Sequence, residues 1–239
     1  GKVYSLEYND FKKSDEYFNN IDYKTEGYRT KISSSYIPKA DWELNYSINY
    51  QKNNYKDGQI NEKQEYLIVG TEVEWNKYDD LNLKFDYGQS LIKDNSDFKK
   101  LELSWDKLVR VKKDKLFYNV SGGISSKKTP FNYIFKAGGD SKIPLRGQDY
   151  DIAGNEYLSG NIEYHKWLID NWIIGFVDLW GITFLDYGKI IPFDTSFSDL
   201  PWEIDGGVGL VFDTTFGIMR LDIGLDNLKE KPKYYINFE

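Results

Sequence analysis

The stretch Trp42 to Tyr50, which reads WELNYSINY, decides the fold class because its residues alternate without exception. Aromatic and aliphatic residues take every second position, and polar residues fill the positions between them. Only a β-strand places two such sets on opposite faces. The stretch therefore predicts a strand with one apolar face and one polar face.

The same period of two recurs along the chain and predicts eleven further strands. These are Val3–Asn9, Tyr28–Ile37, Glu65–Trp75, Leu81–Tyr87, Leu101–Trp105, Leu116–Ile124, Leu158–Leu168, Trp172–Phe184, Gly206–Phe212, Met219–Leu225 and Tyr234–Phe238. No segment has a convincing helical pattern. We therefore predict an all-β, antiparallel architecture of about twelve strands in a single domain, residues 1–239.

Composition excludes several classes of protein. A net charge of −7 supplies no basic stripe for nucleic acid, and the absence of cysteine excludes disulfides and thiolate chemistry. The mean hydropathy of −0.62 is typical of a soluble protein. Hydropathy is a poor guide here, because the strands of a membrane barrel alternate lipid-facing apolar and lumen-facing polar residues.

The connections alternate in length along the predicted strands. Short ones lie at Pro38–Asp41, Lys77–Asp80, Ile169–Asn171 and Thr214–Phe216, whereas long ones lie at Lys12–Gly27, Lys52–Asn61, Lys127–Glu156 and Asp186–Trp202. All long connections therefore fall at one end of the strands. This asymmetry is typical of outer-membrane barrels, which have short periplasmic turns and longer external loops.

Aromatic residues near many predicted strand ends favour the same class, since membrane barrels carry aromatic girdles at both interfaces. Trp42, Trp75 and Trp105 are examples. A soluble β-sandwich or ligand-binding barrel would have the same period of two. That alternative stays open on alternation alone, and the connection lengths and aromatic ends favour the membrane barrel.

The longest connection contains a glycine-rich turn and an arginine, in the stretch Phe135 to Tyr150, FKAGGDSKIPLRGQDY. The turn holds Gly138 and Gly139, and Arg146 follows it. A half-buried arginine among short amphipathic strands needs an acidic partner. Glu163 and Asp178 are the two downstream candidates.

The second half of the chain resembles the BamA, TamA and FhaC superfamily of outer-membrane barrels, which assemble or translocate proteins. Three stretches carry the resemblance: the Gly138–Gly139 turn followed by Leu145, Arg146 and Gly147; the strands containing GNIEY and GFVDLWG; and DGGVGLVFDTTFGIMRLDIGL at Asp205–Leu225. The terminal YYINFE is similar to the aromatic last strand of such barrels.

This resemblance implies that the external loop folds back into the lumen and that acids on the barrel wall hold Arg146. Alternation agrees, because it places Glu163 opposite the apolar set of its strand and Asp178 opposite Val177 and Leu179. Two features depart from the superfamily. Its barrels usually have sixteen strands, and Gln148 stands here where an aromatic residue is usual.

Enzyme chemistry has little support in the sequence. His165 is the single histidine, so a histidine metal cluster is excluded, and no G-x-S-x-G motif accompanies Ser159. We predict no enzyme activity, no cofactor and no metal, and expect His165 only to make hydrogen bonds. Acidic pairs such as Asp79–Asp80 are interpreted as solvated turns rather than calcium sites.

The predicted function is that of a barrel in the bacterial outer membrane that inserts, secretes or anchors an attached or partner polypeptide. The expected partners are outer-membrane lipid, a client or passenger polypeptide and, in an oligomer, a second copy, with no nucleic acid. The barrel of a patatin-like autotransporter is one form that the resemblance includes. The alternative is a passive pore or structural barrel without translocase activity.

Overall fold

The structure is a computed structural model, and it describes residues 2–18, 21–57, 60–77, 79–93, 95–130, 133–137, 143, 145–146, 153–171, 177–192, 195–225 and 232–238. No helix in these ranges has both the length and the apolar character needed to cross a membrane.

Twelve strands form one antiparallel sheet in which chain order is sheet order, and the predicted strand number is confirmed. The strands are β1 (Lys2–Phe18), β2 (Ile21–Lys39), β3 (Trp42–Asp57), β4 (Ile60–Trp75), β5 (Asp80–Ser90), β6 (Phe98–Val111), β7 (Asp114–Ser125), β10 (Glu156–Asn171), β11 (Val177–Ile191), β12 (Glu203–Thr214), β13 (Gly217–Leu225) and β14 (Lys233–Phe238). A separate pair comprises β8 (Phe135–Lys136) and β9 (Ala153–Gly154), and one 3-10 turn, η1, spans Phe197–Asp199.

Contacts divide the chain into two compact units, each described separately below. Unit 1 comprises Gly1–Ser104, Gly122–Phe135 and Gly154–Glu156, and unit 2 comprises Trp105–Ser121, Lys136–Ala153 and Tyr157–Glu239.

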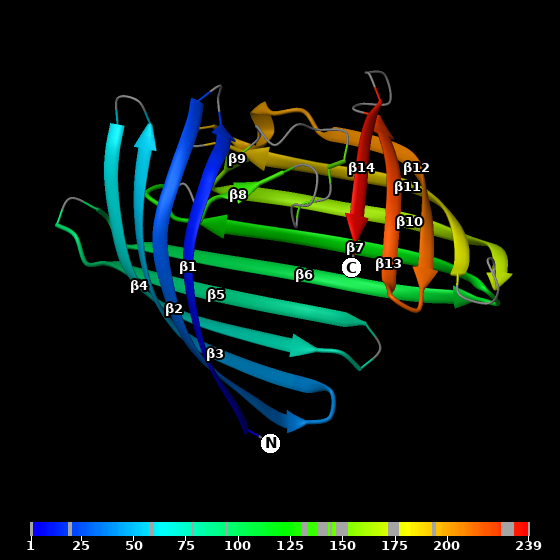
Figure 1. Ribbon diagram of the computed structural model, residues 1–239, viewed down its shortest axis with the longest axis horizontal. Coiled ribbons are helices and arrows are strands. Elements are labelled where there is room, and N and C mark those ends of the chain that lie inside the picture. The colour runs from blue at the N-terminus through cyan, green and yellow to red at the C-terminus, as the bar shows by residue number, and fades with distance from the viewer. Residues whose placement is uncertain are drawn as a thin grey trace. The chain divides into compact units, whose positions relative to one another are not determined.

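In unit 1 the strands β1 to β4 run side by side as two long hairpins (Figure 1). Cross-strand pairing continues to Phe18↔Ile21 in the first hairpin and to Asp57↔Ile60 in the second. The prediction of long loops at Lys12–Gly27 and Lys52–Asn61 was therefore wrong. Both faces of these segments are polar in sequence, so the period of two disappears although the backbone ladder continues.

The apolar residues of unit 1 form a band of defined height. Trp42 pairs with Trp75 at one edge of the band and Tyr50 pairs with Leu67 at the other. The Tyr50 ring also lies 5.6 Å from that of Tyr28, so aromatic residues border the band at both edges. On β3 the band runs from Trp42 to Tyr50, close to the roughly 9–11 residues that a tilted strand needs to cross a bilayer core.

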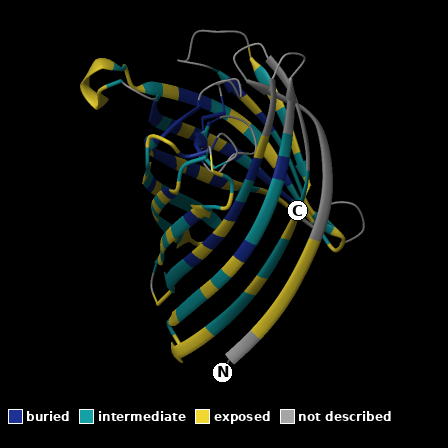
Figure 2. Ribbon diagram, turned by 90° about the vertical axis from the view of Figure 1, so that its left-hand side faces the viewer, coloured by how far each residue is buried: buried dark blue, intermediate teal, exposed yellow. Residues whose placement is uncertain are grey.

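The two faces of unit 1 differ in exposure, and residues of different exposure alternate along its strands (Figure 2). Ile48 is 54% exposed on the apolar face, whereas the adjacent Asn49 is 5% exposed on the polar face. The apolar side chains therefore project outward, whereas the polar ones lie on a face that is at least partly covered. This is the reverse of a soluble β-sandwich, in which the apolar face is the buried one.

A segment that follows β7 covers part of the polar face of unit 1. Tyr133 packs its ring 4.8 Å from that of Phe98, and Tyr66 completes a buried aromatic cluster. The Tyr133 hydroxyl also donates a hydrogen bond to Gln51 Oε1 on β3. The beginning of the long connection thus folds onto the polar side of the sheet.

In unit 2 the same alternation continues through β10 and β11. On β10 Ser159, Asn161, Glu163 and His165 are buried, whereas the intervening Leu158, Ile162 and Tyr164 are exposed. On β11 the buried set that includes Trp180, Ile182, Phe184 and Asp186 alternates with exposed Thr183 and Leu185. The strands therefore present a mixed polar and aromatic face on the side that the chain covers.

Candidate functional site

The site is a group of charged side chains on the buried face of unit 2, which we call the arginine cluster. It consists of Arg146 from the long connection, Asn161, Glu163 and His165 from β10, Asp186 from β11, and Arg220 and Asp222 from β13. Where a strand contributes more than one residue, these residues are two positions apart, because alternate positions of a strand share one face.

Arg146 binds three carboxylates. Its Nε and Nη2 atoms donate to the two oxygens of Asp186 at 2.7 and 2.5 Å, a bidentate arrangement, and its backbone N–H also reaches Asp186 at 3.2 Å. Its Nη1 atom donates to Glu163 at 2.7 Å and to Asp222 at 3.2 Å. Such charge-assisted, forked bonds fix direction as well as contributing energy.

The guanidinium of Arg146 lies flat against an aromatic ring. Its central carbon is 3.5 Å from the ring centroid of Phe184, and the Phe184 ring lies over Gly207. A Cβ at Gly207 would lie only 2.4 Å from that ring, so the glycine makes room for it. Stacking of this kind is a reason why arginine and lysine are not interchangeable.

Glycine also allows the loop backbone to approach the strands. A Cβ at Gly224 would lie 2.9 Å from the Arg146 backbone oxygen, and a Cβ at Gly188 would lie 3.3 Å from the side chain of Leu145. Leu145 is fully buried. The loop therefore rests on positions of β11 and β13 that have no side chain.

A second arginine closes the cluster. Arg220 donates to Asp222 at 2.7 Å and to both oxygens of Glu163, at 2.9 and 3.1 Å. Glu163 is thus shared between Arg146 and Arg220. Asn161 adds a neutral donor to Asp186 at 2.5 Å.

His165 borders the cluster. Its Nε2 atom lies 2.8 Å from Glu163 Oε2, and its ring lies 4.5 Å from that of Phe117. Ser159 is fully buried and its hydroxyl is hydrogen-bonded to Ser121 at 2.9 Å. This arrangement gives neither residue the placement of a nucleophile and its base, which should be hydrogen-bonded to each other.

The environment holds Arg146 in its charged form. Burial alone would lower the pKa of its guanidinium, but hydrogen bonds to Asp186 and the negative charges of Asp186, Glu163 and Asp222 outweigh burial and raise that pKa. The cluster is therefore a permanent ionic contact rather than a group that exchanges protons near neutral pH.

The structure brings together two of the residues singled out from the sequence, Arg146 and Glu163, at 2.7 Å. It pairs Arg146 with Asp186 and not with Asp178, so the prediction that Asp178 binds the arginine was wrong. Asp178 lies on the expected face of β11, but Asp186, farther along the same strand, is the residue that binds the arginine. The predicted Gly138, Gly139 and Gly147 lie outside the described residues.

Sequence reasoning missed Asp186, Arg220 and Asp222. The prediction ended the strand at Phe184, whereas β11 continues to Ile191 and includes Asp186. Arg220 and Asp222 alternate with Met219, Leu221 and Ile223, so their position on the polar face could have been read from the stretch IMRLDIG.

The cluster offers no evident metal site. Within the described ranges no group of three or more histidine, aspartate or glutamate side chains is arranged to hold a metal ion. Guanidinium groups already occupy the oxygens of Glu163 and Asp186. The arrangement can hold the long connection, at Arg146, against β10, β11 and β13.

The sequence matches no protein-family model, and it matches no curated protein. Solved structures do match. The chain is similar to BamA from Haemophilus ducreyi, in a crystal structure lacking POTRA domains 1-3, with a TM-score of 0.74 and 10% identity over 98% of this chain and 57% of that one. It is also similar to CdiB from Acinetobacter baumannii, with a TM-score of 0.69 and 13% identity over 99% of this chain and 47% of that one.

A more distant match is the translocator domain of the autotransporter NalP from Neisseria meningitidis, with a TM-score of 0.43 and 11% identity over 93% of this chain and 81% of that one. The chain spans about half the length of the BamA and CdiB structures. The BamA and CdiB matches confirm the predicted fold, because the twelve-stranded antiparallel sheet matches the barrel fold of those two structures.

Proposed function

We propose that the chain is the membrane module of a bacterial outer-membrane protein that inserts, secretes or anchors a polypeptide. The observation that carries this proposal is the arginine cluster, which ties Arg146 of the long connection to carboxylates on three strands. A passive pore needs an open lumen, whereas this contact holds part of the long connection against the covered face of the strands. The fold shared with BamA and CdiB supports the proposal.

The membrane location rests on the exposed apolar band. Tyr46, Ile48 and Val69 are each about half exposed on a face bordered by aromatic residues. Exposed apolar surface of this extent marks a contact with lipid or protein. We infer that outer-membrane lipid covers it.

No enzymatic activity is part of the proposal. The three carboxylates around Arg146 are engaged by its guanidinium group and that of Arg220, and His165 is engaged by Glu163. The partner is instead a polypeptide, attached to the chain or supplied as a client.

Location is tested by purification. A chain that extracts from membranes only with detergent, and that changes electrophoretic mobility on heating, supports the outer-membrane barrel. A chain that purifies without detergent would overturn it and favour a soluble ligand-binding barrel.

Polypeptide handling is tested by fusing an unstructured, polar passenger to the amino end of the chain and treating intact cells with protease. Passenger that is shaved from cells in which the barrel is inserted supports secretion or anchoring. Passenger that stays protected in those cells would overturn it. In a planar bilayer, a steady conductance would favour the passive pore, whereas a closed or flickering channel would favour the loop-filled module.

A further inference from the structure

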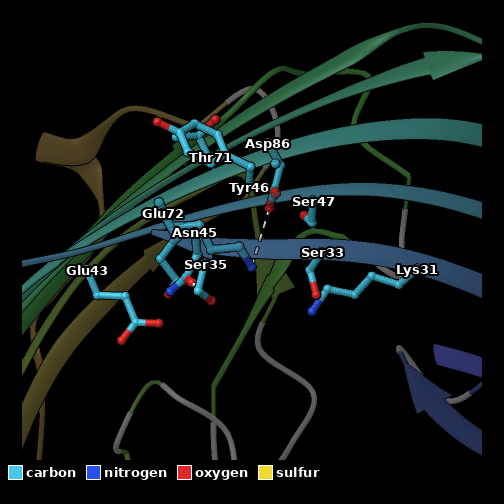
Figure 3. Close-up of a pocket in the computed structure, with 12 residues that line it drawn as sticks. Lys31, Ser33, Ser35, Glu43, Asn45, Tyr46, Ser47, Thr71, Glu72 and Asp86 are labelled. Carbon is cyan, nitrogen blue, oxygen red and sulfur yellow. Dashed lines mark hydrogen bonds and ion pairs between the residues drawn. The ribbon is translucent and has the colours of Figure 1, made fainter. Parts of the chain in front are cut away.

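A groove lies on the polar face of unit 1, beside the part that Tyr133 covers. Its cavity of about 300 Å³ is lined by β2, β3, β4 and β5 (Figure 3). It begins on β4 at Gly70, the next inward position after the buried Tyr66 and Ile68. A Cβ at Gly70 would lie 2.7 Å from Ser47 Oγ and 2.6 Å from Asp86 Oδ1, so the glycine leaves room for these two side chains, which line the groove.

Two unpaired charges lie at opposite ends of this groove, Lys31 at one end and Glu43 at the other (Figure 3). Neither has an ion-pair or hydrogen-bond partner among the residues that the structure describes. Lys31 is in register with Asn49, which is on the same strand as Glu43. The two charges are therefore about 20 Å apart along the strands, at roughly 3.3 Å per residue.

The other charges of the groove are engaged. Lys84 lies 3.4 Å from Asp86, and Glu72 accepts a hydrogen bond from Asn82 at 2.6 Å. Glu72 keeps its negative charge because Asn82 is a neutral donor, so the groove is anionic toward Glu43 and its available cation is Lys31. An occupant with opposite charges at its two ends would complement it in one orientation.

Short polar side chains line the floor between these ends. Ser33, Ser35, Asn45 and Ser47 lie between Lys31 and Glu43 (Figure 3). Hydroxyl and amide groups both donate and accept hydrogen bonds, as peptide groups and polar side chains require. They offer no apolar surface to an acyl chain.

We propose that this groove binds an extended, polar polypeptide segment of about six residues, the length that spans about 20 Å. Its acidic end lies at Lys31 and its basic end at Glu43. The proposal rests on the proposed function, because it names the class of client that the barrel handles: a polar, unfolded segment rather than an apolar one.

Cysteine labelling tests the groove directly, because the chain has no cysteine of its own. The variants Ser35→Cys and Ser34→Cys place a thiol on opposite faces of β2; Ser35 lines the groove near Glu43, and Ser34 pairs with Tyr4 and Tyr46 on the apolar face. The probe is a six-residue peptide of serine, asparagine and glycine with lysine at one end, glutamate at the other and a bromoacetyl group on the lysine end.

The measured quantity is the labelling rate with this peptide divided by the rate with bromoacetamide, in detergent-solubilised protein. Binding raises the local concentration of the reactive lysine end, so the ratio at Ser35→Cys should exceed that at Ser34→Cys by about tenfold or more. An excess of the same peptide without the bromoacetyl group should remove the difference. Equal ratios at the two positions would overturn the proposal.

Orientation gives a second and independent outcome. Ser35→Cys is nearer Glu43 than Ser33→Cys, so the lysine end of the probe should label it faster. In the double variant Lys31→Glu with Glu43→Lys, which keeps the net charge, this order should reverse. An unchanged order would overturn directional binding. Failure of the proposed function has a different sign: the protein would purify without detergent. A protein that needs detergent but gives equal labelling ratios would overturn the groove proposal alone.

Discussion

Arg146 and Asp186 meet in a bidentate ion pair, with two guanidinium nitrogens at 2.7 and 2.5 Å from the two carboxylate oxygens. Both residues are buried, and Asp186 is fully so. Removing one partner of a buried pair leaves the other charge without compensation. This pair therefore governs whether the loop stays against the strands.

The variant Arg146→Ala should release the loop. Breaking a buried ion pair costs about 3–5 kcal/mol, so thermolysin should cleave the long connection much faster while the barrel remains folded. Arg146→Lys should behave more like the alanine variant than like the native chain, because lysine keeps the charge but loses the fork and the stacking on Phe184. Arg110→Ala at the exposed end of β6 is the control. Cleavage at the native rate in Arg146→Ala would contradict loop anchoring.

The variants Asp186→Ala and Asp178→Ala distinguish the partner found in the structure from the one expected from the sequence. Both residues lie on the same face of β11, so each is a control for the other. A double-mutant cycle between Arg146→Ala and Asp186→Ala should give a coupling energy of at least about 1.5 kcal/mol, and the cycle with Asp178→Ala less than about 0.5 kcal/mol. Urea unfolding in detergent measures both, and the opposite order would refute the assignment.

The variant Gly224→Ala should displace the loop although it removes no charge. The new methyl group would lie 2.9 Å from a backbone oxygen of Arg146, and backbone cannot move aside as a side-chain end can. Gly181→Ala is the matched control, because its Cβ would meet only the flexible end of Leu168 at 3.2 Å. Protease protection of the long connection should fall in the first variant and not in the second.

The variant Val69→Arg tests the lipid contact of the apolar band. An arginine on the lipid face destabilises a barrel by about 2–4 kcal/mol at the bilayer midplane and by less toward an interface. Val69 lies between the middle of the band and its edge at Leu67, so we expect a loss of about 2 kcal/mol. Glu72→Arg, on the polar face of the same strand, should change the free energy of unfolding by less than about 1 kcal/mol. Refolding into phospholipid vesicles measures both values, and equal losses would argue against a bilayer on the Val69 side.

The connection between β5 and β6 should respond to acid. The Ser90 amide and the Tyr87 hydroxyl both donate to Asp97 at 2.9 Å, and these hydrogen bonds hold the pKa of its carboxyl below the ordinary value. Because the folded pKa is the lower one, the stabilisation is present above about pH 3.9 and is lost as pH falls through the folded pKa. An NMR titration of the Ser90 amide should therefore show a midpoint below about 3.9, whereas a midpoint at or above that value would contradict the contact.

Alternation predicted much of the fold, because a strand with one apolar face has an apolar residue at every second position of its sequence. The period of two correctly placed Glu163 on the covered side of β10 and Asp178 on the covered side of β11. It could not choose between Asp178 and Asp186, which share that side. The choice depends on how far β11 extends and on its stagger against β10, and neither is visible in the period of a single strand.

The outer parts of β1 to β4 were missed for the opposite reason. From Lys12 to Gly27 and from Lys52 to Asn61 neither face is apolar, so the sequence has no alternation to detect. Backbone pairing continues there regardless, as the pairs Lys12↔Glu26 and Lys56↔Asn61 show. The alternation in the sequence therefore ends where the apolar band ends, several residues before the strands do.

Those outer parts give the protein a second environment. Beyond the Tyr28 and Tyr50 rings, the paired strands continue for several residues with polar sequence on both sides. In an outer membrane this paired backbone would extend past the lipid-covered band. It would be open to an antibody, a phage or a neighbouring cell, and it is a place at which an epitope could be inserted.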